Sequence, residues 1–454
     1  MPSFPPIPQF DLTAQQPVTI DSLVAALTAR LGVPSNPYWV LPELTAYVIE
    51  ALRTWNAFTK HWTVRRTLET VPGTLFYDLS EPQGPSNQPL IPYTVRDIDV
   101  VPTMEYHLLE PANTAVWTGT EMFTLADLTD SLQRRRDQFL LETGAVLSQY
   151  TLAVNASSAG RFTVPDALID VRRAVFQDTD GKYYQMSRED EIALASFLPL
   201  WDRTSKTPKA WSVSVTPPFQ IQIAPAPKVL GYLQMLVVAT GAMLSLSSAV
   251  PLGVPDDFSW VVKFGALADL LGKDSPARDT ARATYCEQRY QDGADLARRA
   301  SSVINCTIGN RQCRVGSLYD MDAFTPNWHN RIGTPNRMGM AGMNILSPGC
   351  VPDTQYGIAV DIVQNAPVAS SSADLGLSPS VADALIDYAE HLAAFKMGGE
   401  EFTATMPQYQ NFMRLAGVNN DRYTANAQFA TTLRDRETRE ETERWRRVPL
   451  QPAS

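Results

Sequence analysis

The sequence predicts an α+β fold: a helical bundle interrupted by antiparallel β excursions, with an additional C-terminal helical unit. Three observations predict it. Apolar residues recur with helical spacing in several separate blocks. Between these blocks, apolar and polar residues alternate and Pro-Gly or Asp-Gly turns follow, as in antiparallel strands. The length of 454 residues suggests two to four folding units.

The first third of the chain alternates between helix and strand. We expect an extended, proline-rich arm over residues 1–18, a helical hairpin over 19–62, a β excursion over 63–118 and a helix over 119–150. Thr19 or Asp21 can cap the first helix, and Gly32 can end it. The stretch "YTVRDIDVVPTMEYHLL" is assigned to strand.

The rest of the chain repeats this alternation. We expect a β insertion over 151–255, a helical core over 256–303 that closes the bundle, a loop-rich connector over 304–375, and a C-terminal helical extension with a charged tail over 376–454. Asp180-Gly181 marks a hairpin turn in the insertion. Asp256 or Asp257 is expected to cap the helical core. The connector is assigned to loop because it is rich in Gly, Asn, Pro and Met.

Composition excludes several classes of function. The formal net charge is −10, which argues against a general nucleic-acid binder because an acidic chain repels phosphate on average. The start of the chain does not resemble a secretory signal, and the most apolar run, 233–250, is too interrupted to span a membrane. The four cysteines form no CxxC pair, so we expect free thiols in a reducing compartment. They are Cys286, Cys306, Cys313 and Cys350.

Motifs for catalysis or cofactor binding are not found in the sequence. It contains no nucleotide-binding glycine loop, serine-hydrolase elbow or histidine pair with metal-ligand spacing. Asp97 and Asp99 could hold a hard cation if they lie on one face of a strand, but a solvated strand face is the better interpretation. We therefore expect no cofactor, no metal and no enzymatic activity.

Three consecutive arginines interrupt the stretch "LQRRRDQFLLETG", residues 132–144. On a helical wheel Arg136 falls near the centre of the apolar stripe, Arg135 at its edge and Arg134 on the opposite side. The three side chains cannot form one basic face, which weakens the hypothesis of a DNA-binding patch. Arg136 requires a carboxylate or carbonyl partner. We expect Arg136→Ala to impair folding or assembly and Arg134→Ala to be mild.

The charged tail is predicted to be a helix with acid-before-base pairs four residues apart. A solvated surface helix is the ordinary interpretation. Trp445, Arg446 and Arg447 near its end suggest a docking segment instead, because aromatic residues and arginines are enriched at interfaces.

One long stretch resembles a known family. The segment "PDDFSWVVKFGALADLLGKDSPARDTARATYCEQRYQDG" resembles the helical core of head–tail connector (adaptor) proteins of tailed bacteriophages. The arginine triplet belongs to the same resemblance, which covers roughly residues 19–303 and leaves 304–454 unaccounted for. We take the following as candidate assembly residues: Arg134, Arg135, Arg136, Arg282, Tyr285, Arg289, Tyr290, Trp445, Arg446 and Arg447.

The resemblance implies a structural protein of the virion neck, assembled in the host cytoplasm. Such a protein is expected to form a homo-oligomeric, 12-fold ring beneath the portal and to dock tail or tail-hub proteins. Genomic DNA would pass through the ring without sequence recognition, and no membrane partner is expected. The docking segment would be the charged tail or the proline-rich arm.

Three alternatives stay open: another tail component such as a tail terminator, tube or baseplate protein; a carbohydrate-binding module or hydrolase that uses the β excursions; and a DNA binder that uses Arg134–Arg136.

Overall fold

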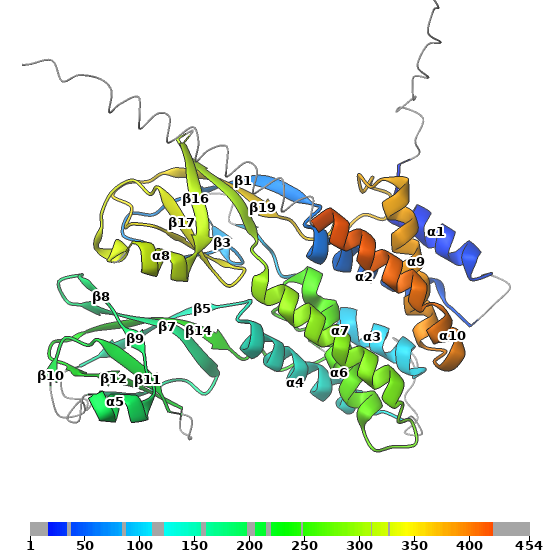
Figure 1. Cartoon of the computed structure of the whole chain (residues 1–454), viewed down its shortest axis with the longest axis horizontal. Helices are drawn as coiled ribbons and strands as arrows, with labels where there is room; N and C mark the ends of the chain where they lie inside the picture. The colour runs from blue at the N-terminus through cyan, green and yellow to red at the C-terminus, as the bar shows by residue number, and fades with distance from the viewer. Residues whose placement is uncertain are drawn as a thin grey trace, which may run out of the picture. The chain divides into compact units, whose positions relative to one another are not determined.

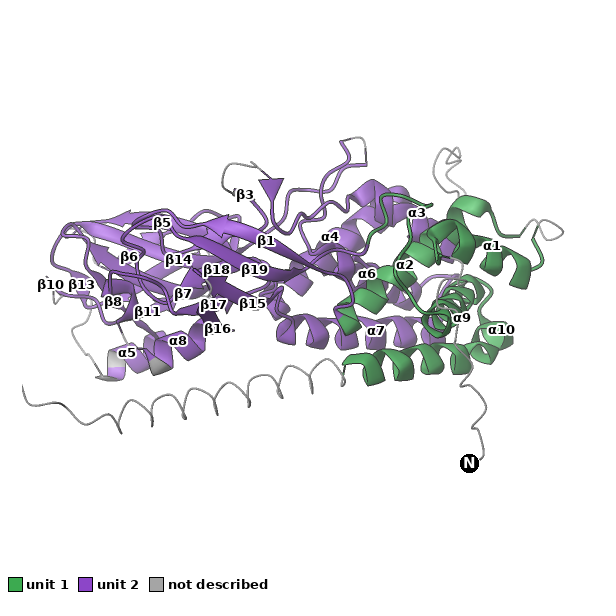
Figure 2. Cartoon of the chain, turned by 90° about the horizontal axis from the view of Figure 1, so that it is seen from above, with its two compact units in different colours: residues 1–59, 367–454 green, residues 60–366 purple. Residues whose placement is uncertain are grey.

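A computed structural model describes most of the chain (Figure 1). The described residues are 17–33, 38–83, 88–110, 122–155, 160–197, 205–214, 219–246, 248–309, 311–325 and 327–420. The proline-rich arm up to residue 16 and the tail from residue 421, with Trp445, Arg446 and Arg447, lie outside this part. The chain divides into two compact units, residues 1–59 with 367–454 (unit 1) and residues 60–366 (unit 2), coloured separately in Figure 2.

The described part of unit 1 is helical and combines segments from the first and last parts of the chain. It contains α1 (Ile20–Arg30), α2 (Leu41–Thr59), α9 (Pro379–Phe395), α10 (Gly399–Ala404) and a further helical run over residues 406–420. Thr19 caps α1 as expected, since its side chain accepts a hydrogen bond from the Ser22 N–H. Both α1 and α2 pack against α9. The first hairpin therefore shares a compact unit with the C-terminal helices, not with the later helical blocks as the sequence suggested.

A buried ion pair links α2 to the end of α9 in unit 1. The Lys396 ammonium lies 2.8 Å from Glu43 Oε1 and also donates to the Tyr38 carbonyl at 2.7 Å. Glu43 is 1% exposed and Lys396 is 5% exposed. The Tyr47 hydroxyl donates to the same carboxylate, so both charges are compensated inside the helical packing.

Unit 2 contains a layer of four helices: α3 (Asp97–Leu108), α4 (Leu125–Thr143), α6 (Ser259–Gly272) and α7 (Thr280–Arg299). α4 begins with a capping box between Thr124 and Asp127, and it ends at Gly144, whose φ of 58° is left-handed. α6 packs against both α4 and α7. The expected helical core is present here, built from the blocks around residues 119–150 and 256–303.

The strand assignment for residues 97–108 is wrong, because this segment is helix α3. Asp99 accepts a hydrogen bond from the Arg96 N–H at the first turn. Val100, Met104 and His107 are buried at helical spacing, a period that the β-branched residues between them obscured. Asp97 and Asp99 consequently do not share a face, which removes the hypothetical cation site on a strand.

The capping role proposed for Asp256 or Asp257 is also wrong. Both carboxylates hold other segments of unit 2 and do not cap α6, which follows the short 3₁₀ helix η1 (Asp256–Phe258). Asp256 accepts the backbone N–H of Thr94 at 2.7 Å and of Val95 at 3.0 Å. Asp257 accepts the N–H of Ala366 at 3.1 Å.

A seven-stranded sheet occupies much of the segment expected to be loop. Its strands lie in the order β1 (Thr63–Glu69), β19 (Gly357–Val363), β15 (Val303–Ile308), β16 (Arg311–Ser317), β17 (Arg337–Ala341), β18 (Ile345–Pro348) and β2 (Tyr77–Asp78). All neighbours are antiparallel except β16 and β17, which α8 (Leu318–Phe324) and η2 (Trp328–Asn330) connect. The loop assignment for 304–375 was wrong. In β17, Met, Gly and Ala replace the β-branched residues that usually indicate strands, whereas β15 and β19 are short strands rich in Val and Ile within a segment rich in Gly, Asn and Pro.

Residues 148–239 form a β-sandwich. One sheet has the order β5 (Ser148–Val154), β14 (Gly231–Ala239), β7 (Leu168–Asp178) and β8 (Tyr183–Gln185). The other has the order β6 (Arg161–Thr163), β12 (Gln220–Ala224), β11 (Ala210–Val213) and β9 (Ser187–Arg188). Side chains of both sheets, including Phe176 and Trp211, share one buried cluster. The Asp180-Gly181 turn is present as predicted, with Gly181 at φ 80°.

The smaller elements complete unit 2. They are α5 (Glu191–Phe197), a two-stranded parallel pair of β10 (Ser205–Lys206) and β13 (Ala226–Pro227), and a two-stranded antiparallel pair of β3 (Pro82–Gln83) and β4 (Gln88–Pro89). In the described part of the chain, no helix combines the length and apolar character needed to cross a membrane.

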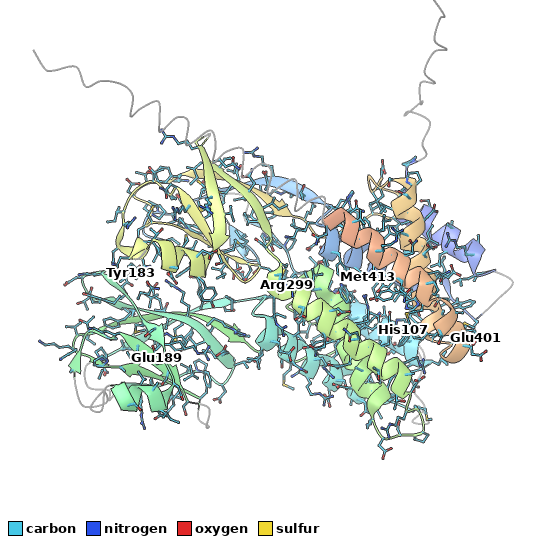
Figure 3. The ribbon with its side chains drawn as sticks, in the orientation of Figure 1. His107, Tyr183, Glu189, Arg299, Glu401 and Met413 are labelled. Atoms are coloured by element: carbon cyan, nitrogen blue, oxygen red, sulfur yellow. The ribbon has the colours of Figure 1, made fainter. Side chains whose placement is uncertain are left out.

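A polar clamp joins the sandwich to the seven-stranded sheet. The Arg173 guanidinium on β7 donates to both carboxylate oxygens of Asp322 on α8, at 3.0 and 2.9 Å. The Trp328 indole N–H donates to the same carboxylate. Beside the clamp, the Asn330 amide exchanges two hydrogen bonds with the backbone of Tyr183; Tyr183 is labelled in Figure 3. The two β regions are therefore fixed together by directional contacts.

Candidate functional site

Arg136 lies in the interior of the helical core. Its side chain is fully buried among the apolar residues of α4, as the helical wheel predicted. The guanidinium donates from Nη1 to the Ala242 carbonyl at 2.6 Å and from Nε to the Asp137 carboxylate at 3.0 Å. Gly241 makes this position possible, because a Cβ there would lie 2.5 Å from the guanidinium carbon. Arg136 therefore joins α4 to the segment after β14.

The other two arginines of the triplet share one carboxylate. Arg134 Nη2 lies 2.6 Å from Asp269 Oδ2, and Arg135 Nη2 lies 2.5 Å from Asp269 Oδ1. Arg135 also pairs with Glu287 at 2.9 Å, so it connects α4 to both α6 and α7. The Arg135 side chain is only 12% exposed and therefore adds little positive charge to the surface. The Arg134 side chain is 63% exposed.

Electrostatics around Asp269 favour its ionised form. Burial raises the pKa of this carboxyl, but the hydrogen bonds from Arg135 and Arg134 outweigh that effect and lower the pKa below its ordinary value. The Arg135 guanidinium also lies 5.1 Å from the centre of the Tyr290 ring. With these contacts the triplet crosslinks three helices and presents no common cationic face to DNA.

The predicted residues of α7 lie in the same core. Arg289 is 1% exposed, and its guanidinium lies 4.5 Å from the centre of the Trp260 ring and 5.2 Å from that of Phe264. Tyr290 is fully buried and donates to Glu142 at the end of α4. Two glycines allow this close packing: a Cβ at Gly265 would lie 2.8 Å from Tyr290, and one at Gly293 would lie 2.4 Å from Val261. These side chains hold the helices of one subunit together.

Two further predicted residues lie at the edge of this core. Arg282 donates to the Asp279 carboxylate at 2.7 Å, where Asp279 also caps α7. The Tyr285 ring meets the Phe264 ring edge-to-face at 6.0 Å. The structure thus brings seven of the ten candidate assembly residues into the α4–α6–α7 layer, and the remaining three lie in the tail outside the described residues.

Several titratable side chains of unit 2 are buried in its interior. Lys263 Nζ lies 3.2 Å from His107 Nε2 between α6 and α3, and both residues are buried; His107 is labelled in Figure 3. His329 is also buried, between Trp328 and Tyr183. In the described part of the chain, no group of three His, Cys, Asp or Glu side chains could hold a metal ion.

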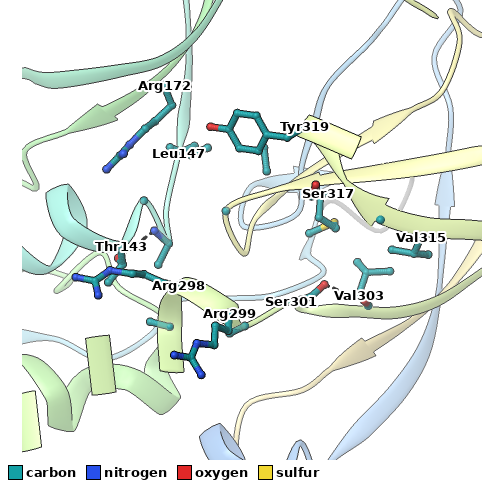
Figure 4. A pocket seen from close by; sticks show the side chains of 18 of the residues that line it. Thr143, Leu147, Arg172, Arg298, Arg299, Ser301, Val303, Val315, Ser317 and Tyr319 are labelled. Carbon is teal, nitrogen blue, oxygen red and sulfur yellow. Dashed lines mark hydrogen bonds between the residues drawn. The ribbon is translucent and has the colours of Figure 1, made fainter. Parts of the chain in front are cut away.

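A cavity of about 680 Å³ opens where α4 and α7 end beside the seven-stranded sheet (Figure 4). Arg172, Arg298 and Arg299 contribute to its lining, with Tyr319 on the opposite wall. Arg172 donates to the Leu141 carbonyl and Arg298 to the Glu142 carbonyl, so both satisfy the C-terminal end of α4. Arg299 has no ion-pair partner among the described residues.

This cavity was not predicted from the sequence. The doublet Arg298-Arg299 at the end of a helix is a detectable signal, because basic residues favour helix C-termini. Arg172 comes from a distant strand, β7, and Tyr319 from a segment assigned to loop. Their convergence depends on how the sandwich and the seven-stranded sheet meet the helices, which no local pattern encodes.

Comparison with known proteins identifies a family for part of the chain. Residues 112–307 match the SU10 adaptor protein family, a range that includes α4, α6, α7 and the whole sandwich. The match confirms the resemblance to phage head–tail adaptor proteins within unit 2. No curated protein matches the chain.

Proposed function

We propose that this protein is a head-to-tail adaptor of a tailed bacteriophage, which forms a ring beneath the portal, extends the DNA channel and docks the tail. The observation that carries the proposal is the match of residues 112–307 to the adaptor family. The residues that carried the sequence resemblance, among them Arg289 and Tyr290, form the interior of the matched helical layer. In this layer the Arg289 guanidinium and the Tyr290 hydroxyl contact other side chains of the same core, as expected for a structural protein.

The charge of the chain suits a channel wall. With a net charge of −10, the protein repels a DNA backbone on average, which favours passage over retention. Arg134 and Arg135 are engaged by Asp269, so they add little attraction for phosphate. We infer that DNA passes without sequence recognition, and that contacts to the portal come from other residues, with Trp445, Arg446 and Arg447 as the proposed docking segment.

Binding to the portal tests the proposal. The full chain and a variant that carries Trp445→Ala, Arg446→Ala and Arg447→Ala are mixed with purified portal and separated by size-exclusion chromatography. We expect the wild-type protein to co-elute with the portal and the variant to lose most of this binding while keeping its circular-dichroism spectrum. An absence of co-elution for the wild type would count against the adaptor function. Equal co-elution of both proteins would refute the docking segment alone.

Retention on DNA separates the adaptor from a DNA-binding protein. Salt-dependent retention of the purified protein on duplex DNA, lost on Arg134→Ala, would favour the DNA-binding alternative. We expect no retention at about physiological ionic strength, where nonspecific binding by a basic protein is still measurable.

A further inference from the structure

Two of the four cysteines lie side by side on adjacent strands of the seven-stranded sheet. Cys306 on β15 and Cys313 on β16 are directly opposed partners in the antiparallel ladder. Both belong to the buried cluster on one face of this sheet, at 0% and 4% exposure. As directly opposed residues their side chains lie on the same face of the sheet, and the Cys313 thiol also donates to the Pro335 carbonyl at 3.9 Å. The cysteines therefore form a side-chain pair, although seven positions separate them in the sequence.

The spacing of an antiparallel pair matches that of a disulfide. Directly opposed residues have Cα atoms about 4.5–5.5 Å apart. Disulfides join residues whose Cα atoms lie about 4.4–6.8 Å apart. Since Cys306 and Cys313 are directly opposed and their side chains belong to the same buried cluster, the existing backbone is compatible with a bond between them. All four cysteines are free thiols in the structure.

We propose that Cys306 and Cys313 are a disulfide-forming pair, which closes the β15–β16 hairpin covalently when the protein meets a low-molecular-weight disulfide such as oxidised glutathione. The other two thiols do not take part. Neither is opposed to another cysteine in a strand ladder: Cys286 lies within α7, and Cys350 donates to the Gly333 carbonyl at 3.2 Å.

The chemistry is two thiol–disulfide exchanges. The neighbouring Cys306 thiol lowers the pKa of Cys313, against the opposing effect of burial, and we therefore assign Cys313 as the first nucleophile. Its thiolate attacks one sulfur of oxidised glutathione and releases one glutathione thiolate. Cys306 then loses its proton and attacks the Cys313 sulfur, which releases the second glutathione. Two protein S–H bonds become one S–S bond, and the oxidant is reduced to two thiols that take up the two protons.

Burial makes this reaction depend on local opening of the hairpin. The pair lies two rungs from Ile308–Arg311, the rung nearest the hairpin turn. Fraying from that end exposes the thiols without unfolding the sheet, because β19 and β17 hold the outer sides of β15 and β16. Oxidation is therefore slow in the native protein and faster at temperatures that favour fraying.

The setting of the reaction rests on the proposed function, whereas the chemistry does not. A virion protein folds in a reducing cytoplasm and later meets an oxidising exterior. A disulfide formed then would limit unfolding of the sheet by restricting the unfolded chain. The test below uses purified protein alone, so its outcome is independent of ring formation or portal binding.

Peptide mapping after oxidation tests the inference. The full chain is incubated with oxidised or reduced glutathione, blocked with an alkylating reagent under denaturing conditions, and digested with trypsin. Cleavage after Arg311 separates the two cysteines, so a disulfide links the peptide of residues 300–311 to that of residues 312–314. We expect this linked pair, loss of two of the four thiols, and a rise in unfolding temperature of about 3–6 °C.

Matched cysteine variants serve as controls. Cys350→Ser should keep both the linked peptides and the temperature rise, whereas Cys306→Ser and Cys313→Ser should lose both. Four remaining thiols after incubation at temperatures just below unfolding would overturn the inference. A linked pair that involves Cys286 or Cys350 would overturn it equally.

Discussion

Lys396 in unit 1 and Arg136 in unit 2 are both buried cations, but the partners of the two side chains differ. Unit 1 places Lys396 beside the carboxylate of Glu43, which is 1% exposed. Unit 2 places Arg289 against the Trp260 ring and Arg136 against the Ala242 carbonyl and a partly exposed carboxylate, Asp137. A fully buried ion pair makes each charge dependent on the other. At Arg136 the partners are a neutral carbonyl and a carboxylate that solvent reaches, so removing the arginine leaves no fully buried charge behind.

This difference teaches where each unit is vulnerable. Unit 1 should respond strongly to removal of one partner and recover when both are replaced. In the helical layer of unit 2, each arginine substitution should lower stability independently of the others, and more so the more deeply the side chain is buried. Four predictions sharpen or break this contrast, beginning with the largest expected effect.

Lys396→Met should destabilise unit 1 by about 3–5 kcal/mol, because it leaves the Glu43 carboxylate buried without a counter-ion. Hydrogen exchange of α9 peptides measures the effect separately from unit 2. Adding Glu43→Gln should restore most of the protection. If the double variant is as unstable as the single one, packing and not charge holds this position.

Arg136→Ala should destabilise unit 2 by about 2–4 kcal/mol, since it leaves the Ala242 carbonyl without its donor and creates a cavity in α4. Urea unfolding followed by circular dichroism measures the loss. Gly241→Ala should be similarly damaging, because its Cβ would clash with the guanidinium. Wild-type stability of both variants would disprove the role of this contact.

His329 should make the stability of unit 2 depend on pH. Burial lowers its pKa to about 4, with a further contribution from Arg173, so the folded state holds the ring neutral while the unfolded state binds a proton below about pH 6.5. Stability is therefore lost as pH falls, by about 2 kcal/mol between pH 7 and pH 5.

His329→Phe is the matched variant for this effect. The variant should remove the share of the pH dependence that comes from His329, because phenylalanine does not titrate. It should cost no hydrogen bond, since neither ring nitrogen of His329 has a hydrogen-bond partner among the described residues. Parallel stability curves for wild type and variant, measured by thermal unfolding across the same pH range, would contradict the assignment.

Arg134→Ala should change stability by less than about 0.5 kcal/mol, because its pair with Asp269 is exposed and Arg135 keeps that carboxylate compensated. The same urea unfolding used for Arg136→Ala provides the comparison. If Arg134→Ala lowers the free energy of unfolding as much as Arg136→Ala does, the exposure of these side chains on α4 does not determine their contributions to stability.

The helical layer was the most predictable part of the molecule. The burial order of Arg134, Arg135 and Arg136 follows from helical periodicity alone, which local sequence encodes. Their partners could not be predicted: Asp269 lies 134 residues beyond Arg135, and Ala242 lies 106 residues beyond Arg136. Periodicity fixes which side chain is buried, whereas partners depend on tertiary packing.

The errors concern segments whose tertiary context overrides local pattern. Residues 97–108 contain β-branched residues yet form a helix, because one helical face is buried. β17 contains mostly Met, Gly and Ala yet pairs in a sheet, because its neighbours β16 and β18 supply the ladder. The first hairpin joined α9 for a similar reason, since its apolar face does not specify which distant helix will cover it.

Electron microscopy of the protein bound to purified portal tests the central claim most directly. The adaptor account predicts a closed ring coaxial with the portal, with a continuous channel and the rotational symmetry of a 12-fold assembly. Isolated copies scattered over the portal, or portal particles with no added density at saturating protein, would contradict it.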